Sequence, residues 1–145
     1  MKKILSVSLA LAIALTVTSC SKEKKLEKRL HKVGEWDVVS VVIEDDGTET
    51  TYENPGSFTF NEDGTGTHTL QLGTTTAETE TFKWENGEST VTITHDEEAG
   101  HDDHAHEDEA DVWTVVTNEK EKQEWTLTED HGNHEQTITL TLEKK

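Results

Sequence analysis

The segment from His95 to Asp111 carries the residue types best suited to chemistry. It has no basic residue, its carboxylates are interleaved with imidazoles, and it holds half of the chain's eight histidines: His95, His101, His104 and His106. Neutral imidazoles bind borderline divalent metals, and carboxylates add oxygen ligands and negative potential. Without a cysteine the segment cannot form a finger-type zinc site, and it lacks the calcium-binding EF-hand pattern. It therefore predicts capture of a divalent ion, with zinc expected and copper or nickel as alternatives.

Residues 96–110 cannot position this chemistry themselves. They contain almost no apolar surface to bury, so they cannot fold alone. A structureless loop longer than about 12 residues is usually either functional or disordered. A solvated acidic loop that merely tolerates histidine therefore remains the alternative, and neighbouring elements must decide between the two.

Those elements are strands. From Glu35 onward apolar and polar residues alternate, the residues are strand formers such as Thr, Val, Ile and Trp, and turn signals recur every eight to twelve residues. The pattern gives about nine short runs and no clear helix, including one turn at Asn54-Pro55-Gly56. One dry face along consecutive hairpins favours closure, because a barrel has no exposed edge strands. The fold class is therefore all-β, an up-and-down antiparallel barrel of about 8–9 strands.

The positions of the turns predict at which end of the barrel the histidines lie. In an up-and-down meander successive turns alternate between the barrel ends, so one end should hold the turns at 54–56, 73–75, 96–110 and 130–135. The other end should hold those at 44–47, 61–64, 86–87 and 118–122. Six histidines would then gather at one mouth as metal ligands: His95, His101, His104, His106, His131 and His134. His68 alternates with Leu70 and Leu72, so we expect it to point into the barrel, as a core histidine rather than a ligand.

The N-terminus reads as an export signal. Lys2 and Lys3 precede a short apolar run, and Val17-Thr18-Ser19-Cys20 resembles a bacterial lipobox. The resemblance implies that residues 1–19 are a signal peptide and that Cys20 is lipidated, with palmitate among the attached acyl chains. Residues 20–32 would be a charged tether, with at most a helical turn at its end, and 33–145 the domain. Residue 21 is a serine and not the aspartate that often signals retention in the inner membrane. We therefore expect the outer membrane, on its periplasmic face or at the cell surface.

Charge limits the partners. The whole chain has a net charge of −18, and without residues 1–19 it keeps 11 basic and 31 acidic residues. Such a field repels nucleic acid and anionic membranes and attracts cations and basic partners. Nucleic-acid binding is not expected.

Three short motifs carry a family resemblance. Gly34-Glu35-Trp36 is followed by Phe58-x-Phe60-x-x-x-Gly64 and by Phe82-x-Trp84. In this order they resemble the lipocalin-like domain of bacterial lipoproteins, over Val33 to Lys145. The chain departs from the lipocalin pattern in that its only arginine, Arg29, precedes the first strand. The resemblance implies a barrel that holds a small apolar ligand.

Function is then weighed among binding roles. The first is a lipid-anchored module that captures metal through the histidine loop, less tightly as imidazoles protonate below about pH 6.5. The second is a carrier of a small apolar ligand, although these side chains could simply fill the barrel: Trp36, Phe58, Phe60, His68, Trp84, Trp113 and Trp125. The third is an envelope interaction protein whose acidic surface meets a basic partner. No strained Gly-x-Ser-x-Gly turn or free reactive cysteine is expected, so we predict no enzyme.

Overall fold

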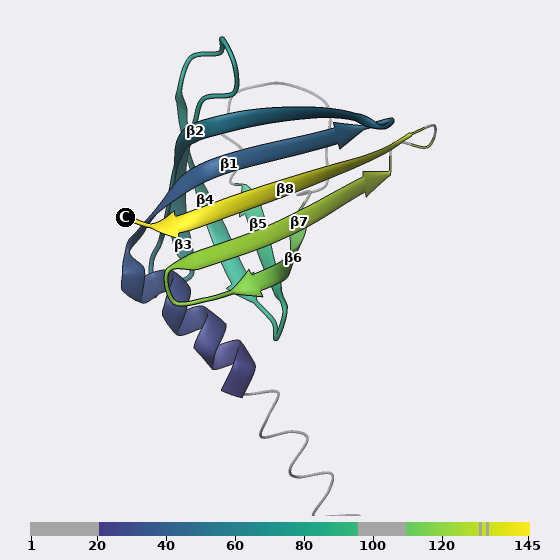
Figure 1. Cartoon of the computed structure of the whole chain (residues 1–145). Helices are drawn as coiled ribbons and strands as arrows, with labels where there is room; N and C mark the ends of the chain where they lie inside the picture. Colours follow the sequence, from purple (N-terminus) through teal and green to yellow (C-terminus); the bar gives the residue numbers. More distant parts are fainter. Residues whose placement is uncertain (1–20, 96–109, 131, 133) are drawn as a thin grey trace, which may run out of the picture.

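Eight antiparallel strands close into a barrel in the computed structural model, which describes residues 21–95, 110–130, 132 and 134–145 (Figure 1). Each strand pairs with its neighbours in the chain, and β1 also pairs with β8. The predicted up-and-down barrel is confirmed. The strands are β1 (Glu35–Asp45), β2 (Thr48–Phe60), β3 (Thr65–Leu70), β4 (Glu78–Asn86), β5 (Thr90–His95), β6 (Ala110–Asn118), β7 (Lys122–Asp130) and β8 (Glu135–Lys144).

One predicted turn is wrong, because Asn54-Pro55-Gly56 lies inside β2. The pairing of β1 with β2 shifts register between Val38 and Ser40, so the extra residue forms a bulge and the strand continues. Gly56 is required here, because a Cβ on it would lie 1.8 Å from the backbone oxygen of Thr69. The two short runs are therefore one strand. The 46–47 turn consequently lies at the barrel end where β3 and β5 finish, opposite to the end expected.

The strand phases place the core as predicted. Trp36 and Trp125 are fully buried, and Phe60 is 1% exposed at the centre of an aromatic cluster. The ring of Phe60 has its centroid 5.4 Å from that of Trp84, 5.5 Å from that of Phe82 and 5.8 Å from that of Trp125. These separations are those of rings in direct contact. Among the described residues, the buried core runs from Leu26 to Leu142.

Residues 21–33 form a helix and not the expected tether. Leu26 and Leu30 have no exposed surface and belong to the core cluster. The indole nitrogen of Trp36 donates a hydrogen bond to the backbone oxygen of Leu30 at 3.1 Å. Arg29 donates to both the backbone and the side-chain oxygen of Asn118. The charged residues are therefore the outer face of an amphipathic helix that packs on the barrel.

Because the helix packs on one of them, the two ends of the barrel differ. The helix end is formed by Glu35, Asn86, Asn118 and the turns beside them, and it is covered by residues 21–33 (Figure 1). The histidine end is formed by the last residues of β1, β3, β5 and β7, among them His95. No helix in the described ranges is both long enough and apolar enough to span a membrane.

Candidate metal centre

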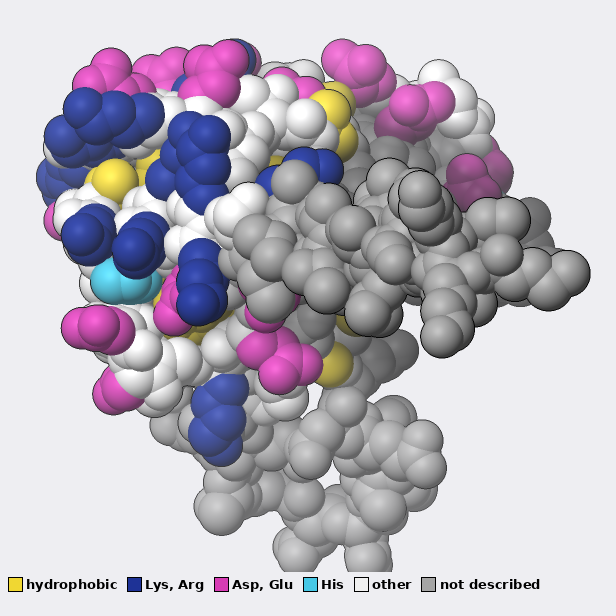
Figure 2. Space-filling view, turned by 90° about the horizontal axis from the view of Figure 1, so that it is seen from below, with side chains coloured by type: hydrophobic (Ala, Val, Ile, Leu, Met, Phe, Trp, Pro, Cys, Tyr) yellow, Lys and Arg dark blue, Asp and Glu magenta, His cyan; other side chains and the backbone are white. Residues whose placement is uncertain are grey.

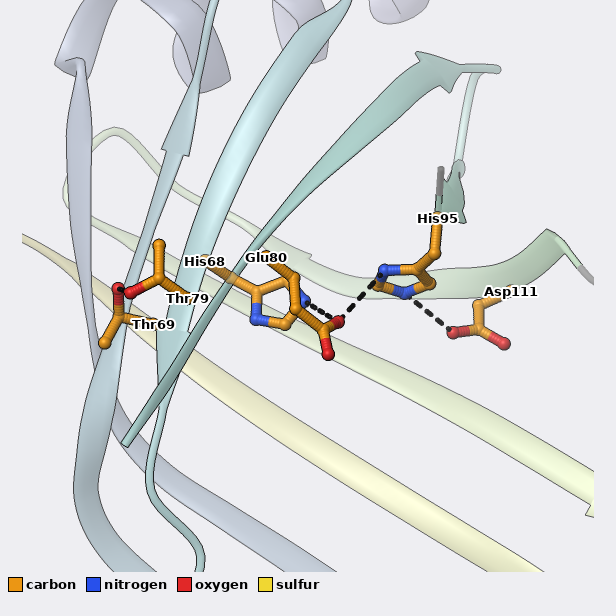
Figure 3. Close-up of polar contacts among 6 residues, drawn as sticks. All are labelled: His68, Thr69, Thr79, Glu80, His95 and Asp111. Atoms are coloured by element: carbon orange, nitrogen blue, oxygen red, sulfur yellow. Dashed lines mark hydrogen bonds and ion pairs between the residues drawn. The ribbon is translucent and has the colours of Figure 1, made fainter. Parts of the chain in front are cut away.

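Three potential metal ligands converge at the histidine end of the barrel. His68 on β3, Glu80 on β4 and His95 at the end of β5 each offer a ligand atom, and these atoms lie within 4.8 Å of one another (Figure 3). The hairpin registers bring them together. His68 pairs with Glu80, and His95 pairs with Phe82, which is two residues from Glu80 and on the same face. All three side chains therefore belong to the inner face of the barrel.

The separations suit an ion better than direct hydrogen bonds. Oε2 of Glu80 lies 3.4 Å from Nε2 of His68 and 3.5 Å from Nδ1 of His95. Two ligand atoms on a tetrahedral zinc, each about 2.1 Å from the metal, lie about 3.4 Å apart. A hydrogen bond from an imidazole to a carboxylate is shorter, at about 2.7–2.9 Å when charged. One glutamate oxygen therefore stands at the ligand-to-ligand distance from both imidazoles.

His95 has one ring nitrogen facing the group of three and the other facing a carboxylate outside it. Its Nδ1, which faces Glu80, is buried and has no hydrogen bond to any described residue. Its Nε2 lies 3.7 Å from Oδ2 of Asp111 on β6 (Figure 3). Histidines that bind metal through one nitrogen usually donate the other N–H to a carboxylate, which fixes the ring and its tautomer. Asp111 stands where that carboxylate is needed.

His68 forms the apolar side of the group. Its ring centroid lies 5.1 Å from that of Phe58 and 5.9 Å from that of Phe82. Burial lowers the pKa of His68, partly opposed by the charge of Glu80 and reinforced by His95. Its imidazole therefore stays neutral, which is the form that binds metal, at pH values where an ordinary histidine begins to protonate. The side chain of Glu80 is 52% exposed, so the group opens to solvent.

The predicted metal ligands divide into placed and unplaced residues. His95 lies in the group of three. His134 lies at the same barrel end but beside β1, with Nε2 3.7 Å from Oδ1 of Asp45. Four more lie outside the described residues, and their metal-binding role remains a prediction: His101, His104, His106 and His131.

Sequence reasoning missed Glu80 and did not assign His68 to the metal. The sequence signal that could have identified these two residues was the spacing of His68, Glu80 and His95 across two turns. A hairpin centred near residue 74 pairs His68 with Glu80, and one whose loop spans residues 87–89 brings His95 opposite Phe82. Because acidic residues are so common in this chain, only the register distinguishes Glu80 from the others.

The predicted lumen residues are mostly core. Trp36, Phe58, Phe60, Trp84 and Trp125 are at most 8% exposed and belong to the core cluster. Trp113 is partly buried against it, with its ring centroid 6.5 Å from that of Trp125. These rings fill the middle of the barrel beneath His68.

Comparison with solved structures supports the fold. A lipocalin-like protein from Bacteroides uniformis ATCC 8492 is 14% identical, with a TM-score of 0.55 over 81% of this chain and 99% of that one. An uncharacterized protein from Bacteroides eggerthii DSM 20697 is 12% identical, with a TM-score of 0.50 over 77% of this chain and 98% of that one. No protein-family model and no curated protein matches the chain. The barrel is lipocalin-like in fold, as the sequence motifs predicted.

Proposed function

We propose that this protein is a lipid-anchored envelope protein that captures a divalent metal ion, with zinc preferred, at the histidine end of its barrel. His68, Glu80 and His95 are the ligands, and Asp111 orients His95. The observation that carries the proposal is the placement of Oε2 of Glu80 at 3.4 and 3.5 Å from one nitrogen of each histidine.

The donor set supports this choice of ion. Two imidazoles and one carboxylate suit zinc, whereas calcium and magnesium prefer oxygen ligands alone. Three protein ligands leave one position of a tetrahedron open. The protein would hold the ion reversibly in a role of capture and delivery, and we propose binding without catalysis.

The other parts of the proposal follow from the sequence. Acylation of Cys20 would anchor the chain, with the outer membrane favoured, and the helix from residue 21 would begin directly at the lipid. The loop histidines would raise the local metal concentration around the barrel group. A ligand in the barrel lumen is less well supported, because the rings that would line it are packed against one another.

A zinc titration of the protein purified without a histidine tag and stripped with a chelator tests the proposal. Calorimetry should show one tight site in the parent chain. The double variant His68→Ala/His95→Ala should lose about a hundredfold or more in affinity for that site, since even partners of metal ligands contribute tenfold to a hundredfold.

Two further variants separate the barrel group from the loop. His101→Ala/His104→Ala/His106→Ala should keep the tight site and lose only weaker binding. His31→Ala, far from both, should behave as the parent. A parent chain that binds no zinc, or a tight site that survives His68→Ala/His95→Ala and is lost in the loop variant, would refute the assignment.

A further inference from the structure

The helix carries a charge opposite to that of the barrel. Residues 21–33 contain six basic and two acidic residues, a net charge of +4. The other 29 acidic residues lie in 34–145, with only five lysines and no arginine. Four of these lysines also lie at the helix end: Lys120, Lys122, Lys144 and Lys145. Almost all of the positive charge in the domain is therefore gathered at one end.

A hollow at this end is lined mainly by cations. Its volume is about 680 Å³, and it is open to solvent. Figure 2 looks at this end and shows Lys and Arg side chains gathered over the described surface. The lining residues are Ser21, Lys24, Lys25, Lys28, Arg29, Lys32, Val33, Lys120 and Lys144.

These lysines are not neutralised by the described part of the protein. Lys22 pairs with Glu88 at 2.7 Å and Lys145 with Glu35 at 2.8 Å, but both pairs lie outside the hollow. Within it, Lys24, Lys28 and Lys32 recur at every fourth residue along one helix face and form no ion pair with any described acid. Three ammonium groups in a row, none of them paired with a described acid, are suited to an anionic partner.

Distance separates this surface from the acidic end. The ten residues of β8 extend over about 30 Å, whereas the Debye length at physiological salt is about 8 Å. An anionic surface at the helix end would therefore meet the lysines of the exposed helix face and be screened from the acidic residues of the histidine end. Glu35, Glu88, Glu119 and Glu121 lie at the helix end itself, and two of them pair with Lys145 and Lys22. The expectation that the net negative charge repels anionic membranes does not hold locally.

We propose that this basic surface docks on the phosphate-bearing headgroups of anionic membrane lipids. Charge complementarity selects the headgroup, and the surface begins at residue 21, beside the cysteine predicted to carry the lipid. The helix would lie against the membrane and the metal group would face away from it. The inference draws on the proposed anchor only for cellular location and is independent of the metal site.

Vesicle flotation tests docking without the anchor. The chain 21–145, which contains the whole described core, is mixed with vesicles of phosphatidylcholine alone or with about one-third phosphatidylglycerol. It should float only with the anionic vesicles and dissociate in roughly 0.5 M sodium chloride, where the Debye length is about 4 Å. Lys24→Gln/Lys28→Gln/Lys32→Gln should reduce partitioning by about tenfold or more.

A control with the same change in net charge makes the test specific. Thr48→Glu/Thr50→Glu/Thr51→Glu, in exposed positions of β2 at the histidine end, also lowers the charge by three units and should float as the parent does. Docking is refuted if the parent does not float with anionic vesicles, or if both variants lose the same amount. It is also refuted if inorganic phosphate, at matched ionic strength, or duplex DNA displaces the protein. The zinc titration is unaffected by any of these results.

Discussion

Two histidines at the histidine end of the barrel each lie beside an aspartate, but their other neighbours differ. His95 and His134 each lie 3.7 Å from an aspartate oxygen. Among the residues that the structure describes, His95 also has a second histidine and a glutamate within ligand distance, and no such group includes His134. A histidine beside one carboxylate is an ordinary surface pair, whereas two histidines sharing a carboxylate oxygen can hold an ion. The neighbours therefore decide the chemistry.

At the scale of single residues we predict that Asp111→Asn weakens zinc binding by about tenfold to a hundredfold, because it removes the carboxylate, 3.7 Å from Nε2 of His95, that would orient this ring on the metal. Competition with a fluorescent zinc chelator measures the change. Asp45→Asn is the matched control, since it removes the equivalent carboxylate beside His134 and should leave the affinity unchanged. Equal losses of zinc affinity in both variants would contradict the prediction, because they would show that these carboxylates act only through the negative charge of this barrel end.

Among the elements, the helix of residues 21–33 is packed into one end of the barrel. Leu26 and Leu30 are four residues apart on one face and both enter the core. Asn86 also donates a hydrogen bond to the backbone oxygen of Glu23 at 3.0 Å, so the helix is joined to β4 as well as to β6. The helix is a structural part of the barrel, and its polar face is thereby held outward.

Leu30→Ala should lower the free energy of unfolding by about 2–5 kcal/mol, as removal of a buried leucine side chain usually does. Urea denaturation followed by tryptophan emission gives the value. Glu27→Ala, exposed on the same helix, should change it by less than about 0.5 kcal/mol. A free tether would instead make both substitutions neutral.

Considered whole, the described part of the molecule is a barrel with an aromatic core in its middle and two chemically distinct ends. Aromatic rings lie in the interior between the helix and the group of His68, Glu80 and His95. The described rings expected to line a lumen contact one another instead, as Phe60 does with Phe82, Trp84 and Trp125. The ends are therefore the candidate functional surfaces: one carries the described histidines His68 and His95, and the other carries the row of lysines on the helix.

Fatty acids should accordingly leave the tryptophan emission of the parent unchanged. Phe60→Ala removes the ring that contacts Phe82, Trp84 and Trp125, and it keeps all four tryptophans. If the cavity stays open, it should admit small apolar molecules, and emission should then respond. A response in the parent as large as that of the variant would indicate an open lumen.

The sequence by itself determined the fold class. Alternation of apolar and polar residues is a local property, so it located the strands, their inner faces and the position of His95 at a strand end. It failed at Asn54-Pro55-Gly56, where turn residues form a bulge because β1 pairs across them. It also predicted a tether where residues 21–33 form a helix. Two leucines among many charged residues give a weak helical pattern, and they become buried because they pack against the barrel end.

Tertiary structure decided the candidate site and the charge separation. Glu80 has no distinguishing local sequence among 31 acidic residues, and it becomes a candidate ligand only through two hairpin registers that place it between His68 and His95. Likewise, a net charge of −18 gives no sign of a basic surface. Both features depend on which residues lie near each other in space, since coordination acts over about 2 Å and electrostatic attraction over about one Debye length.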